Sequence, residues 1–386
     1  MKIIHIVPNA PYNDYWGYQD NLLPKYHKKL GHEVTVITTN TMHKDGKIVE
    51  TDCGEYFLND GVRIIRMKYK DYLCKKITGI KTYLPVYKVL LSLKPDFIFY
   101  HGLISTTIFD VVRYKKKYNK NCIIVQDNHL DYNIGMSCNG IKEWLIRARY
   151  RFINRRSIRY VNRVYGVTPW RKAYAEDYFK IPAKKTDLLI MGADDEKLNF
   201  KNRSEIRSNI RKRYLVSDND FLIVTGGKID KRKKTILLMK ACENLQSVKL
   251  LIFGEVKEDI EEFDEIIKNN TNIIFIGWID ADQVYNYFFA ADLIFFPGQH
   301  SVLWEQACAS KTPCVFEKWD GMDHVNNGGN CDFITPVTIE SIRAKIIELY
   351  KTDKYYNMKK IAESSNTDIY LYSQIAKKSL EECEND

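Results

Sequence analysis

Short apolar runs alternate with helix-like segments along the whole chain, and this alternation predicts an α/β protein. Most of the apolar runs are nearly continuous, which is typical of strands buried on both faces of a parallel sheet. The predicted strands are residues 3–7, 34–39, 62–67, 96–101, 122–126, 163–167 and 187–191, then 221–225, 248–253, 273–276, 293–296, 313–316 and 331–334. The predicted helices are residues 17–30, 84–93, 105–117, 141–161, 234–245, 260–268, 284–291 and 339–351.

A charged stretch in which no strand is predicted, residues 194–220, separates the two series of strands. The chain has 386 residues, which is enough for two domains of ordinary size. The pattern therefore predicts two doubly wound, Rossmann-like α/β domains that face each other across a central cleft, residues 1–195 and residues 196–365. A last helical pattern, at about residues 366–386, could pack back on the first domain.

The two halves of the chain carry charges of opposite sign. Residues 1–195 hold 33 basic and 19 acidic side chains, a net charge of +14, and the remainder holds 26 and 30, a net charge of −4. This asymmetry predicts that the first half faces something anionic. We do not expect a nucleic acid as this partner, because the basic residues are interleaved with aromatic and aliphatic residues at helical spacing. That mixture favours an anionic membrane surface.

Two stretches carry the mixture of basic and apolar residues, one along the predicted helix 141–161 and one between residues 68 and 81. The alternative interpretation is a pair of buried helix faces whose basic edges are solvated. The basic residues of the first stretch are Lys142, Arg147, Arg149, Arg151, Arg155, Arg156 and Arg159, and those of the second are Lys68, Lys70, Lys75, Lys76 and Lys81.

The cysteines and the N-terminal sequence bear on the compartment. The nine cysteines are odd in number, scattered and free of any C-x-x-C pair, which predicts reduced, structural thiols in a cytosolic protein. The apolar run at residues 3–7 is too short for a signal peptide and is typical of a first buried strand. No window reaches about 18 uninterrupted apolar residues, so no transmembrane segment is predicted.

A pair of glycines indicates a phosphate site. Gly226 and Gly227 follow the predicted strand 221–225, and a helix is predicted from residue 234. Glycine lets backbone N–H groups approach a ligand closely, and a helix start adds a positive dipole. Lys228 and Lys233 could then neutralise a diphosphate as point charges. The alternative is a glycine turn followed by a solvated basic run, residues 231–234.

Glu305 is the candidate for ribose recognition. It lies four residues after Ser301 in an apolar, helix-like stretch. A carboxylate there is either a surface residue or an acceptor for a vicinal diol such as that of ribose. Ser301 could cap this helix, whose start offers free backbone donors to an anionic group. His300 stands in the same loop, where solvent exposure is the alternative to a functional role.

These signals belong to a longer set of segments that resembles the family-4 glycosyltransferases, which have the GT-B fold. The run from Gly227 to Lys233 has the spacing of that family's Gly-Arg-Leu-x-x-x-Lys segment. Further segments resemble its motifs over nearly the whole chain. They are Gly31-His32-Glu33-Val34-Thr35-Val36-Ile37, Met191-Gly192-Ala193-Asp194, Ile276-Gly277-Trp278 with Tyr285, Ala290-Ala291-Asp292-Leu293 and Pro297, and Trp304-Glu305-Gln306-Ala307 with Pro313-Cys314-Val315.

The resemblance implies a retaining, hexosyltransferase-type enzyme that moves a sugar from a nucleotide-sugar donor to an acceptor hydroxyl. Lys228 and Lys233 would hold the diphosphate and stabilise it as a leaving group, and Glu305 would accept hydrogen bonds from ribose hydroxyls. Gly17 would let the backbone approach the transferred sugar, and His129 would face that sugar. Further donor-binding positions are Gly227, Gly298, His300 and Ser301.

We expect no cofactor beyond the donor as co-substrate, and no metal. The Asp-x-Asp pairs at residues 218 and 220 and at residues 280 and 282 are typical of turns and helix starts, not of metal ligands. The expected acceptor is a glycan or a lipid-linked molecule. This places the enzyme in cell-surface polysaccharide or glycolipid biosynthesis, in the cytoplasm and peripherally on the inner face of the cell membrane.

The chain departs from the family pattern at two places. Pro297 stands where the family usually has a Glu, eight positions before Glu305, and the loop is about four residues short. Lys228 replaces the usual Arg, which removes a bidentate fork. Two other functions remain open: a GT-B-fold nucleotide-sugar epimerase, for which no convincing acid/base carboxylate pair is found, and a non-catalytic sugar-binding or nucleic-acid-binding protein.

Overall fold

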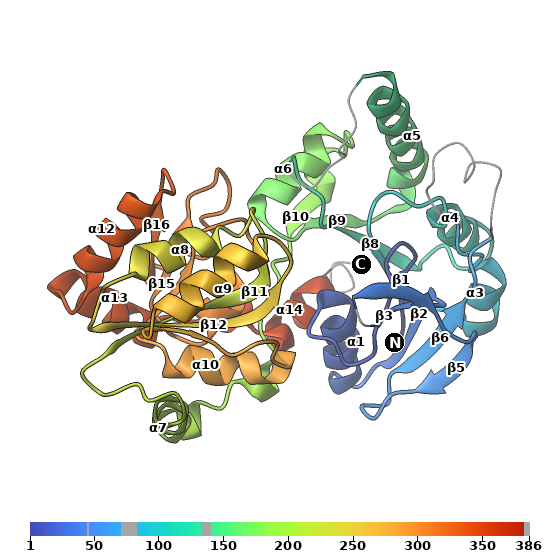
Figure 1. Ribbon diagram of the computed structural model, residues 1–386. Coiled ribbons are helices and arrows are strands. Elements are labelled where there is room, and N and C mark those ends of the chain that lie inside the picture. Colours follow the sequence, from blue (N-terminus) through green and yellow to red (C-terminus); the bar gives the residue numbers. More distant parts are fainter. Residues whose placement is uncertain (45, 71–82, 133–139, 382–386) are drawn as a thin grey trace. The chain divides into compact units, whose positions relative to one another are not determined.

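The computed structural model describes residues 1–44, 46–70, 83–132 and 140–381 (Figure 1). The chain divides into two compact units. The first unit is Met1–Ile190 together with the segment from Tyr372 onward, and the second unit is Met191–Leu371. Lys75, Lys76 and Lys81 of the second basic stretch lie outside the described residues.

The first unit is built on an eight-stranded sheet with the order β10-β9-β8-β7-β1-β2-β6-β5. Neighbouring strands are parallel, except that β5 runs antiparallel to β6. The strands are β1 (Lys2–Val7), β2 (Glu33–Thr39), β5 (Gly54–Phe57), β6 (Arg63–Met67), β7 (Phe97–His101), β8 (Ile123–Asn128), β9 (Arg163–Gly166) and β10 (Thr186–Leu188). A separate antiparallel hairpin consists of β3 (Thr41–Lys44) and β4 (Lys47–Glu50).

Two apolar cores cover the two faces of this sheet. On one face, Ile4 and Ile6 of β1 pack with α3, α4 and α5. On the other face, Ile3 and Val7 pack with α1 and with α14, which contributes Tyr372 and other residues. The alternation of side chains along β1 produces this division. The helices of the first unit are α1 (Gln19–Lys29), α3 (Tyr87–Leu93), α4 (Ile108–Lys117), α5 (Ile141–Ser157), α6 (Pro169–Asp177) and α14 (Tyr372–Ser379).

The second unit is built on a six-stranded, fully parallel sheet with the order β13-β12-β11-β14-β15-β16. Its strands are β11 (Phe221–Ile229), β12 (Val248–Val256), β13 (Ile273–Phe275), β14 (Leu293–Phe296), β15 (Cys314–Glu317) and β16 (Cys331–Ile334). Its helices are α7 (Arg203–Arg213), α8 (Thr235–Cys242), α9 (Ile260–Asn269), α10 (Val284–Ala290), α11 (Leu303–Ala309), α12 (Ile339–Leu349) and α13 (Asp353–Ser364). The predicted class, an α/β protein with two Rossmann-like parallel-sheet domains, is confirmed.

The prediction that a strand ends at residue 225 was wrong. β11 continues through Gly226 and Gly227 to Ile229 and pairs with β12 over this length, with Gly227 opposite Gly254. A Cβ on Gly254 would lie 1.8 Å from the carbonyl oxygen of Gly227, so the two strands pass here only because the position is glycine. The glycine pair therefore belongs to the sheet and not to a turn.

The charged stretch 194–220 is not a linker, because it contains α7. Arg207 and Arg211 of this helix reach Asp292 in ion pairs of 2.6 Å and 3.0 Å. Arg207 also donates to the carbonyl oxygens of Ala290 and Ala291 at the end of α10. Guanidinium groups attach this helix where apolar side chains usually do, which is why the hydrophobic pattern did not reveal it.

Each sheet has a point at which the strand order reverses. β1 lies between β2 and β7, and β11 lies between β12 and β14. In open α/β sheets the loops diverge at such a point, and ligands bind outside the carboxyl ends of the strands there. The loops after β11 and β14 in the second unit, and after β1 and β7 in the first, are the positions this rule selects.

Candidate functional site

In the second unit, Lys228 stands at the carboxyl end of β11. Its side chain is 53% exposed, and its ammonium lies 3.9 Å from a carboxylate oxygen of Asp230. Asp230 is buried, and its Oδ1 accepts hydrogen bonds from the backbone N–H groups of Arg232 and Lys233, each at 3.1 Å. The Asp230 carboxylate therefore fixes the turn that follows β11 and carries Lys233, next to Lys228 at the strand end.

Lys233 joins this turn to the loop that follows β14. Its ammonium donates to the carbonyl oxygens of Gln299 at 2.5 Å and of His300 at 3.2 Å. The N–H of Gln299 donates in turn to the carbonyl oxygen of Arg232 at 2.9 Å. Gly298 lies where the two backbones touch, since a Cβ there would be 2.4 Å from that oxygen of Arg232. Gly298 is thus required for the packing of one loop on the other.

Gly227 brings the end of β11 close to α11. Its φ is +101°, a conformation that favours glycine, and a Cβ there would lie 3.0 Å from the side chain of Leu303. The helix after this strand, α8, begins only at Thr235, and no side chain caps it. The helix predicted from residue 234 is therefore present, but the end of β11 and a turn separate it from Gly226 and Gly227.

α11 carries Glu305 in its first turn, and the Glu305 side chain is completely buried. The alternative that Glu305 is a surface residue was therefore wrong. The helix begins at Leu303 after the N-cap Val302, and no side chain caps it. Ser301 contributes only its carbonyl oxygen, which accepts from the N–H of Trp304 at 3.0 Å. The predicted capping by the Ser301 side chain was wrong, because the helix starts later than the sequence indicated.

Two imidazoles meet a single oxygen of Glu305. The Nε2 atoms of His300 and His324 each donate to Oε1 at 2.8 Å. The other oxygen, Oε2, is buried and has no hydrogen-bond partner among the described residues. His300, for which solvent exposure was the alternative, is instead buried. We call Glu305, His300 and His324 the Glu305 cluster.

No sequence motif pointed to His324, which lies in the loop between β15 and β16. The loop is anchored at this residue and at the next one. The Tyr370 hydroxyl donates to the carbonyl oxygen of His324 at 3.1 Å, and the Asn330 amide donates to that of Val325 at 3.2 Å. A signal was present: His324 stands in a loop rich in turn residues, and this loop begins at the carboxyl end of the parallel strand β15.

The Glu305 cluster favours an ionised carboxylate. Burial raises the pKa of Glu305, but attraction to His300 and hydrogen bonds from both imidazoles outweigh this effect and lower the pKa to about 2. The three ligand atoms lie within 4.8 Å of one another, and two His with one Glu is also a zinc ligand set. A metal-bound imidazole ordinarily donates its other N–H to an acceptor, whereas Nδ1 of His324 is buried without a partner among the described residues. The arrangement therefore fits a hydrogen-bonded carboxylate better than a metal site.

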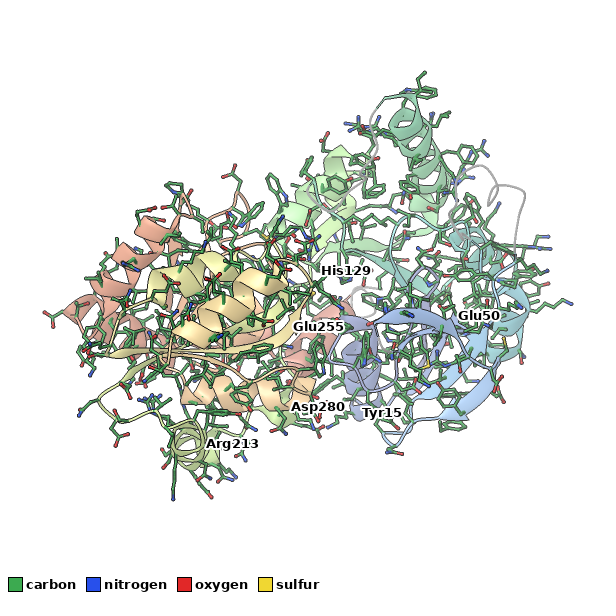
Figure 2. The ribbon with its side chains drawn as sticks, in the orientation of Figure 1. Tyr15, Glu50, His129, Arg213, Glu255 and Asp280 are labelled. Atoms are coloured by element: carbon green, nitrogen blue, oxygen red, sulfur yellow. The ribbon has the colours of Figure 1, made fainter. Side chains whose placement is uncertain are left out.

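The first unit contains a second buried carboxylate that meets two imidazoles. Asp127 Oδ2 accepts from Nδ1 of His101 at 2.8 Å and from Nε2 of His129 at 3.3 Å, and Oδ1 accepts from the N–H of Gly102 at 2.8 Å. We call Asp127, His101 and His129 the Asp127 cluster. Burial raises the pKa of Asp127, but the two imidazoles lower it far below its ordinary value. His129 follows β8 (Figure 2). Its side chain is 42% exposed.

Hydrogen bonds continue from the Asp127 cluster through the interior of the first unit. His101 Nε2 lies 3.1 Å from His5 Nδ1, and His5 Nε2 lies 2.9 Å from His27 Nδ1. His27 Nε2 lies 2.8 Å from the Ser379 hydroxyl in α14. Burial lowers the pKa of His5 strongly and that of His27 to about 3, so both imidazoles are neutral. This histidine string connects β7, β1, α1 and α14.

Gly17 lies in the loop between β1 and α1, directly before Tyr18, the N-cap of α1. Asn13, which belongs to the same loop, fixes this loop through hydrogen bonds to His43. The Asn13 amide donates to the carbonyl oxygen of His43 at 2.8 Å, and its own side-chain oxygen accepts from the N–H of His43 at 2.7 Å. Gly17 therefore belongs to an anchored loop at the carboxyl end of β1.

The basic helix α5 presents both charged and apolar side chains to solvent. Arg155 and Arg156 of this helix and Arg159, just beyond its end, are exposed, and together with Phe152 they line a surface hollow of 490 Å³. The exposed apolar side chains of this helix are Ile141, Trp144, Leu145 and Phe152. In the described parts of the chain, no helix is both long enough and apolar enough to cross a bilayer.

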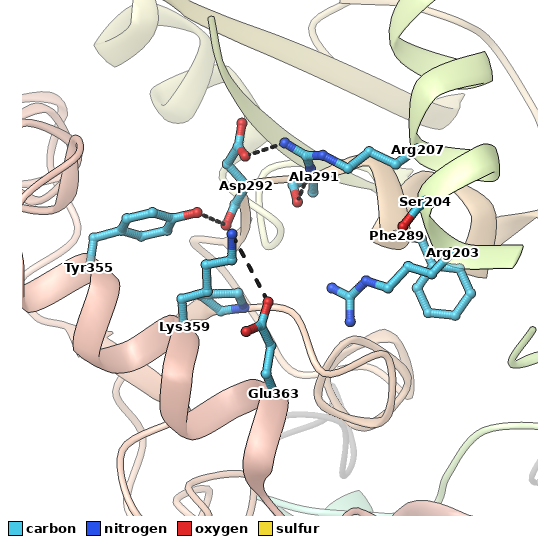
Figure 3. Close-up of a pocket in the computed structure, with 10 residues that line it drawn as sticks. Arg203, Ser204, Arg207, Phe289, Ala291, Asp292, Tyr355, Lys359 and Glu363 are labelled. Atoms are coloured by element: carbon cyan, nitrogen blue, oxygen red, sulfur yellow. Dashed lines mark hydrogen bonds and ion pairs between the residues drawn. The ribbon is translucent and has the colours of Figure 1, made fainter. Parts of the chain in front are cut away.

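A separate hollow of 270 Å³ lies between α7 and α13 in the second unit (Figure 3). Arg203 donates to the Thr312 hydroxyl at 3.2 Å, and Arg207 pairs with Asp292. The Tyr355 hydroxyl donates to the carbonyl oxygen of Asp292 at 3.3 Å. These polar groups attach α7 and α13 to the sheet, so the hollow is explained as part of the helix packing.

The family model described as Glycosyltransferase Family 4 matches residues 22–197, and the one described as Glycosyl transferases group 1 matches residues 206–365. A search of curated protein sequences finds no significant match.

Solved structures of the same fold align over the full chain. A glycosyltransferase from Rickettsia africae has a TM-score of 0.70 at 15% identity, covering 100% of this chain and 99% of that one. HepE from Anabaena in complex with UDP-glucose has a TM-score of 0.65 at 14% identity, covering 100% of both chains. UDP-GlcNAc 2-epimerase from Neisseria meningitidis, bound to UDP-GlcNAc, has a TM-score of 0.60 at 12% identity, again covering 100% of both. At these identities the likeness shows the fold alone.

Proposed function

This chain belongs to the family-4 (group 1) glycosyltransferases, which take a sugar from a nucleotide-sugar donor, and we propose on that premise that it transfers a hexose to a hydroxyl of a glycan or lipid-linked acceptor. The observation that carries the proposal is the meeting of three features at the carboxyl end of one sheet: the turn after β11 at residues 230–234 (the β11 turn), the loop after β14 at residues 297–302 (the β14 loop), and Glu305. The proposed setting is cell-surface polysaccharide or glycolipid biosynthesis, in the cytoplasm. Because HepE is described with UDP-glucose, uridine diphosphate sugars are the first donors to test.

The diphosphate is assigned to the β11 turn. The Lys228 ammonium is exposed at the strand end and acts as a point charge on the phosphates. Gly227, at positive φ beside it, lets the strand end approach the ligand. Lys233 has a double role, because it adds charge and also holds the carbonyl oxygens of Gln299 and His300. Gly298 and Ser301 shape the loop that Lys233 holds.

The ribose is assigned to Glu305, and the transferred sugar to two residues of the first unit. The Glu305 carboxylate is ionised, and one of its oxygens has no partner among the described residues. This oxygen can therefore accept a hydrogen bond from a ribose hydroxyl. His129 is proposed to donate a hydrogen bond to the sugar, and Asp127 orients its imidazole. Gly17 is proposed to let the loop after β1 approach the same sugar.

The proposed reaction retains the anomeric configuration and needs no metal. The acceptor oxygen attacks the anomeric carbon on the face from which the diphosphate leaves. The bond from that carbon to the diphosphate oxygen breaks as the new glycosidic bond forms, and the acceptor proton passes to a diphosphate oxygen. Lys228 and Lys233 stabilise the negative charge that develops on the leaving group.

Release of nucleoside diphosphate from a panel of nucleotide sugars, with and without a membrane extract as a source of acceptor, tests this function. We expect release that depends on the extract, and about a 100-fold or greater loss of turnover in Lys228→Ala, because a charge on the leaving group goes unopposed. Lys231→Ala is the matched control, since this lysine of the same turn is 74% exposed and pairs with Asp259. Interconversion of sugar nucleotides without acceptor would assign epimerisation instead, and unchanged turnover in Lys228→Ala would reject the site.

The exposed face of α5 is proposed to bind the anionic inner surface of the membrane that carries the acceptor. Replacing Arg155, Arg156 and Arg159 together by Ser is expected to reduce flotation with anionic liposomes severalfold, because each basic residue near such a surface contributes about 1 kcal/mol. The control is the triple change to Ser at Lys115, Lys116 and Lys117, which removes the same charge from α4. Equal flotation of the two variants, or no flotation of the wild type at low salt, would end the membrane proposal.

A further inference from the structure

The interior of the second unit holds an ionised carboxylate with one oxygen unused. Glu305 is completely buried, and its Oε2 has no hydrogen-bond partner among the described residues. A buried charged acceptor without a partner is costly to the folded state. A position that keeps such a group is suited to a ligand that supplies the missing donor.

The other oxygen of Glu305 is already saturated by imidazoles from two separately anchored loops. His300 is held from the β11 side, because the Lys233 ammonium binds its carbonyl oxygen at 3.2 Å. Its ring meets the Trp304 ring edge-on at a centroid distance of 5.2 Å. His324 is held by a residue later in the chain, because the Tyr370 hydroxyl donates to the carbonyl oxygen of His324 at 3.1 Å. Two loops that follow different strands therefore converge on Oε1.

We propose that His324, together with His300, is a positioning residue of the ribose subsite: the two imidazoles occupy Oε1 of Glu305 and leave Oε2 as the acceptor for a ribose hydroxyl. This inference rests on the proposed function. Oε2 selects a hydroxyl and not a phosphate, because two anions repel each other whereas an O–H group donates to a carboxylate. His324 acts through Glu305 and has no part in the chemical step.

The consequence of this arrangement is a preference for ribose over deoxyribose. When His324 is replaced by Phe, the ring shape is kept but one of the two donors to Oε1 is lost. His300 alone then holds the carboxylate, so the direction of Oε2 is fixed less firmly. When His324 is replaced by Gln, a side-chain N–H remains to donate to Oε1. We therefore expect His324→Phe to lose discrimination between the two sugars and His324→Gln to retain most of it.

Titration calorimetry on the full chain measures this preference. The probes are UDP, GDP and ADP, each with its 2′-deoxy and 3′-deoxy counterparts. For the nucleotide that binds the wild type best, we expect His324→Phe to weaken binding about tenfold, the size of one hydrogen bond to a charged group. For the deoxy counterpart that binds the wild type more weakly, the affinity should differ less than twofold between the wild type and His324→Phe. His32→Phe, the same substitution at a histidine of the first unit, is the control, and thermal melts verify that each variant is folded.

The outcomes separate this inference from the function on which it rests. If the wild type binds none of the nucleotides, the proposed function fails. If the wild type discriminates between ribose and deoxyribose and His324→Phe does so equally, the positioning role is overturned while the function stands. If Zn²⁺ alone binds the wild type at micromolar concentration and does not bind His324→Phe, the cluster is a metal site and the inference is also overturned.

Discussion

The two units of this protein bury similar clusters, each a carboxylate whose one oxygen accepts from two imidazoles, but only one of the clusters is complete. In the Asp127 cluster the second oxygen accepts from the N–H of Gly102 at 2.8 Å. In the Glu305 cluster the second oxygen is buried and has no partner among the described residues. The same chemical groups therefore stand in two different states of hydrogen bonding.

The difference separates a structural network from a binding site. The Asp127 cluster continues through the histidine string to Ser379, so its hydrogen bonds tie α14 to the sheet of the first unit. The Glu305 cluster ends at Oε2, where the folded chain supplies no donor in its described parts. We infer that the complete cluster contributes mainly to stability, with only His129 exposed to a ligand, and that the incomplete one contributes mainly to affinity.

The largest expected effect that tests this comparison is on stability. Asp127→Asn removes the charge that both imidazoles and a backbone N–H face, and we expect it to lower the free energy of unfolding of the first unit by about 3–5 kcal/mol. Glu305→Gln should cost the second unit only about 1 kcal/mol, because one of its oxygens is unsatisfied already. Hydrogen exchange measured by mass spectrometry on the full chain gives the stability of each unit separately.

The same pair of variants should show the reverse order in nucleotide binding. Glu305→Gln is expected to lower the affinity for the nucleoside diphosphate at least tenfold, whereas Asp127→Asn should leave that affinity within about twofold of the wild-type value. If the two variants destabilise their units equally, or if Asp127→Asn weakens the nucleotide more, the distinction between the clusters is wrong.

A smaller effect is expected from Gly298→Ala, which disturbs the Glu305 cluster without touching its side chains. The added Cβ would meet the carbonyl oxygen of Arg232 at 2.4 Å, so the loop that holds His300 must move away from the β11 turn. We expect a cost of about 2–3 kcal/mol, typical of overpacking, and weaker nucleotide binding. Gln299→Ala in the same loop is the control, because it keeps the backbone hydrogen bond to Arg232. Wild-type affinity in Gly298→Ala would show that the loop contact does not matter to the site.

The smallest expected effect is a difference in acid sensitivity. The pKa of His27 is about 3 in the folded first unit against 6.5 in the unfolded chain. Its stabilising contribution is therefore complete above pH 6.5 and is lost as the pH falls toward 3. At about 1.4 kcal/mol for each pH unit, acidification from pH 6.5 to 5 removes about 2 kcal/mol from the first unit.

The Glu305 cluster behaves differently in the same pH range. The Glu305 pKa of about 2 lies below its ordinary value of 4.5, so its contribution to the second unit is lost only as the pH falls from 4.5 toward 2. Urea unfolding followed by hydrogen exchange at pH 7.5 and pH 5 compares the two units. His27→Gln should remove much of the acid sensitivity of the first unit. If the free energy of unfolding of the first unit falls equally with pH in the wild type and the variant, His27 is not the source of this sensitivity.

The sheets could be predicted from the sequence because their strands are buried on both faces. The run at residues 293–296 became β14 with the same bounds, and most other strands differ by a few residues. The strands β3, β4 and β5 were not predicted, because they are short and carry exposed apolar side chains such as Ile48 and Phe57. α7 was missed for a different reason, since its arginines attach it through ion pairs with Asp292.

The candidate site was predictable only where a motif carries it. Lys228, Lys233 and Glu305 were proposed from glycine and carboxylate patterns and from the family resemblance, and the structure places them at the carboxyl end of one sheet. The contact between His300 and Glu305 was not predicted, and His324 was missed altogether, because His324 reaches Glu305 by loop packing across 19 residues of sequence. The histidine string could not be predicted either, since His5, His27 and His101 meet only through the order of the strands and the position of α1.

A crystal structure of the protein with the nucleoside diphosphate that binds it best tests the central claim most directly. The account predicts the diphosphate beside the Lys228 ammonium and a ribose hydroxyl within hydrogen-bond distance of Oε2 of Glu305, with His300 and His324 still bonded to Oε1. A nucleotide bound elsewhere, for example in the hollow beside Arg203, or a ribose that does not reach Glu305, would contradict it.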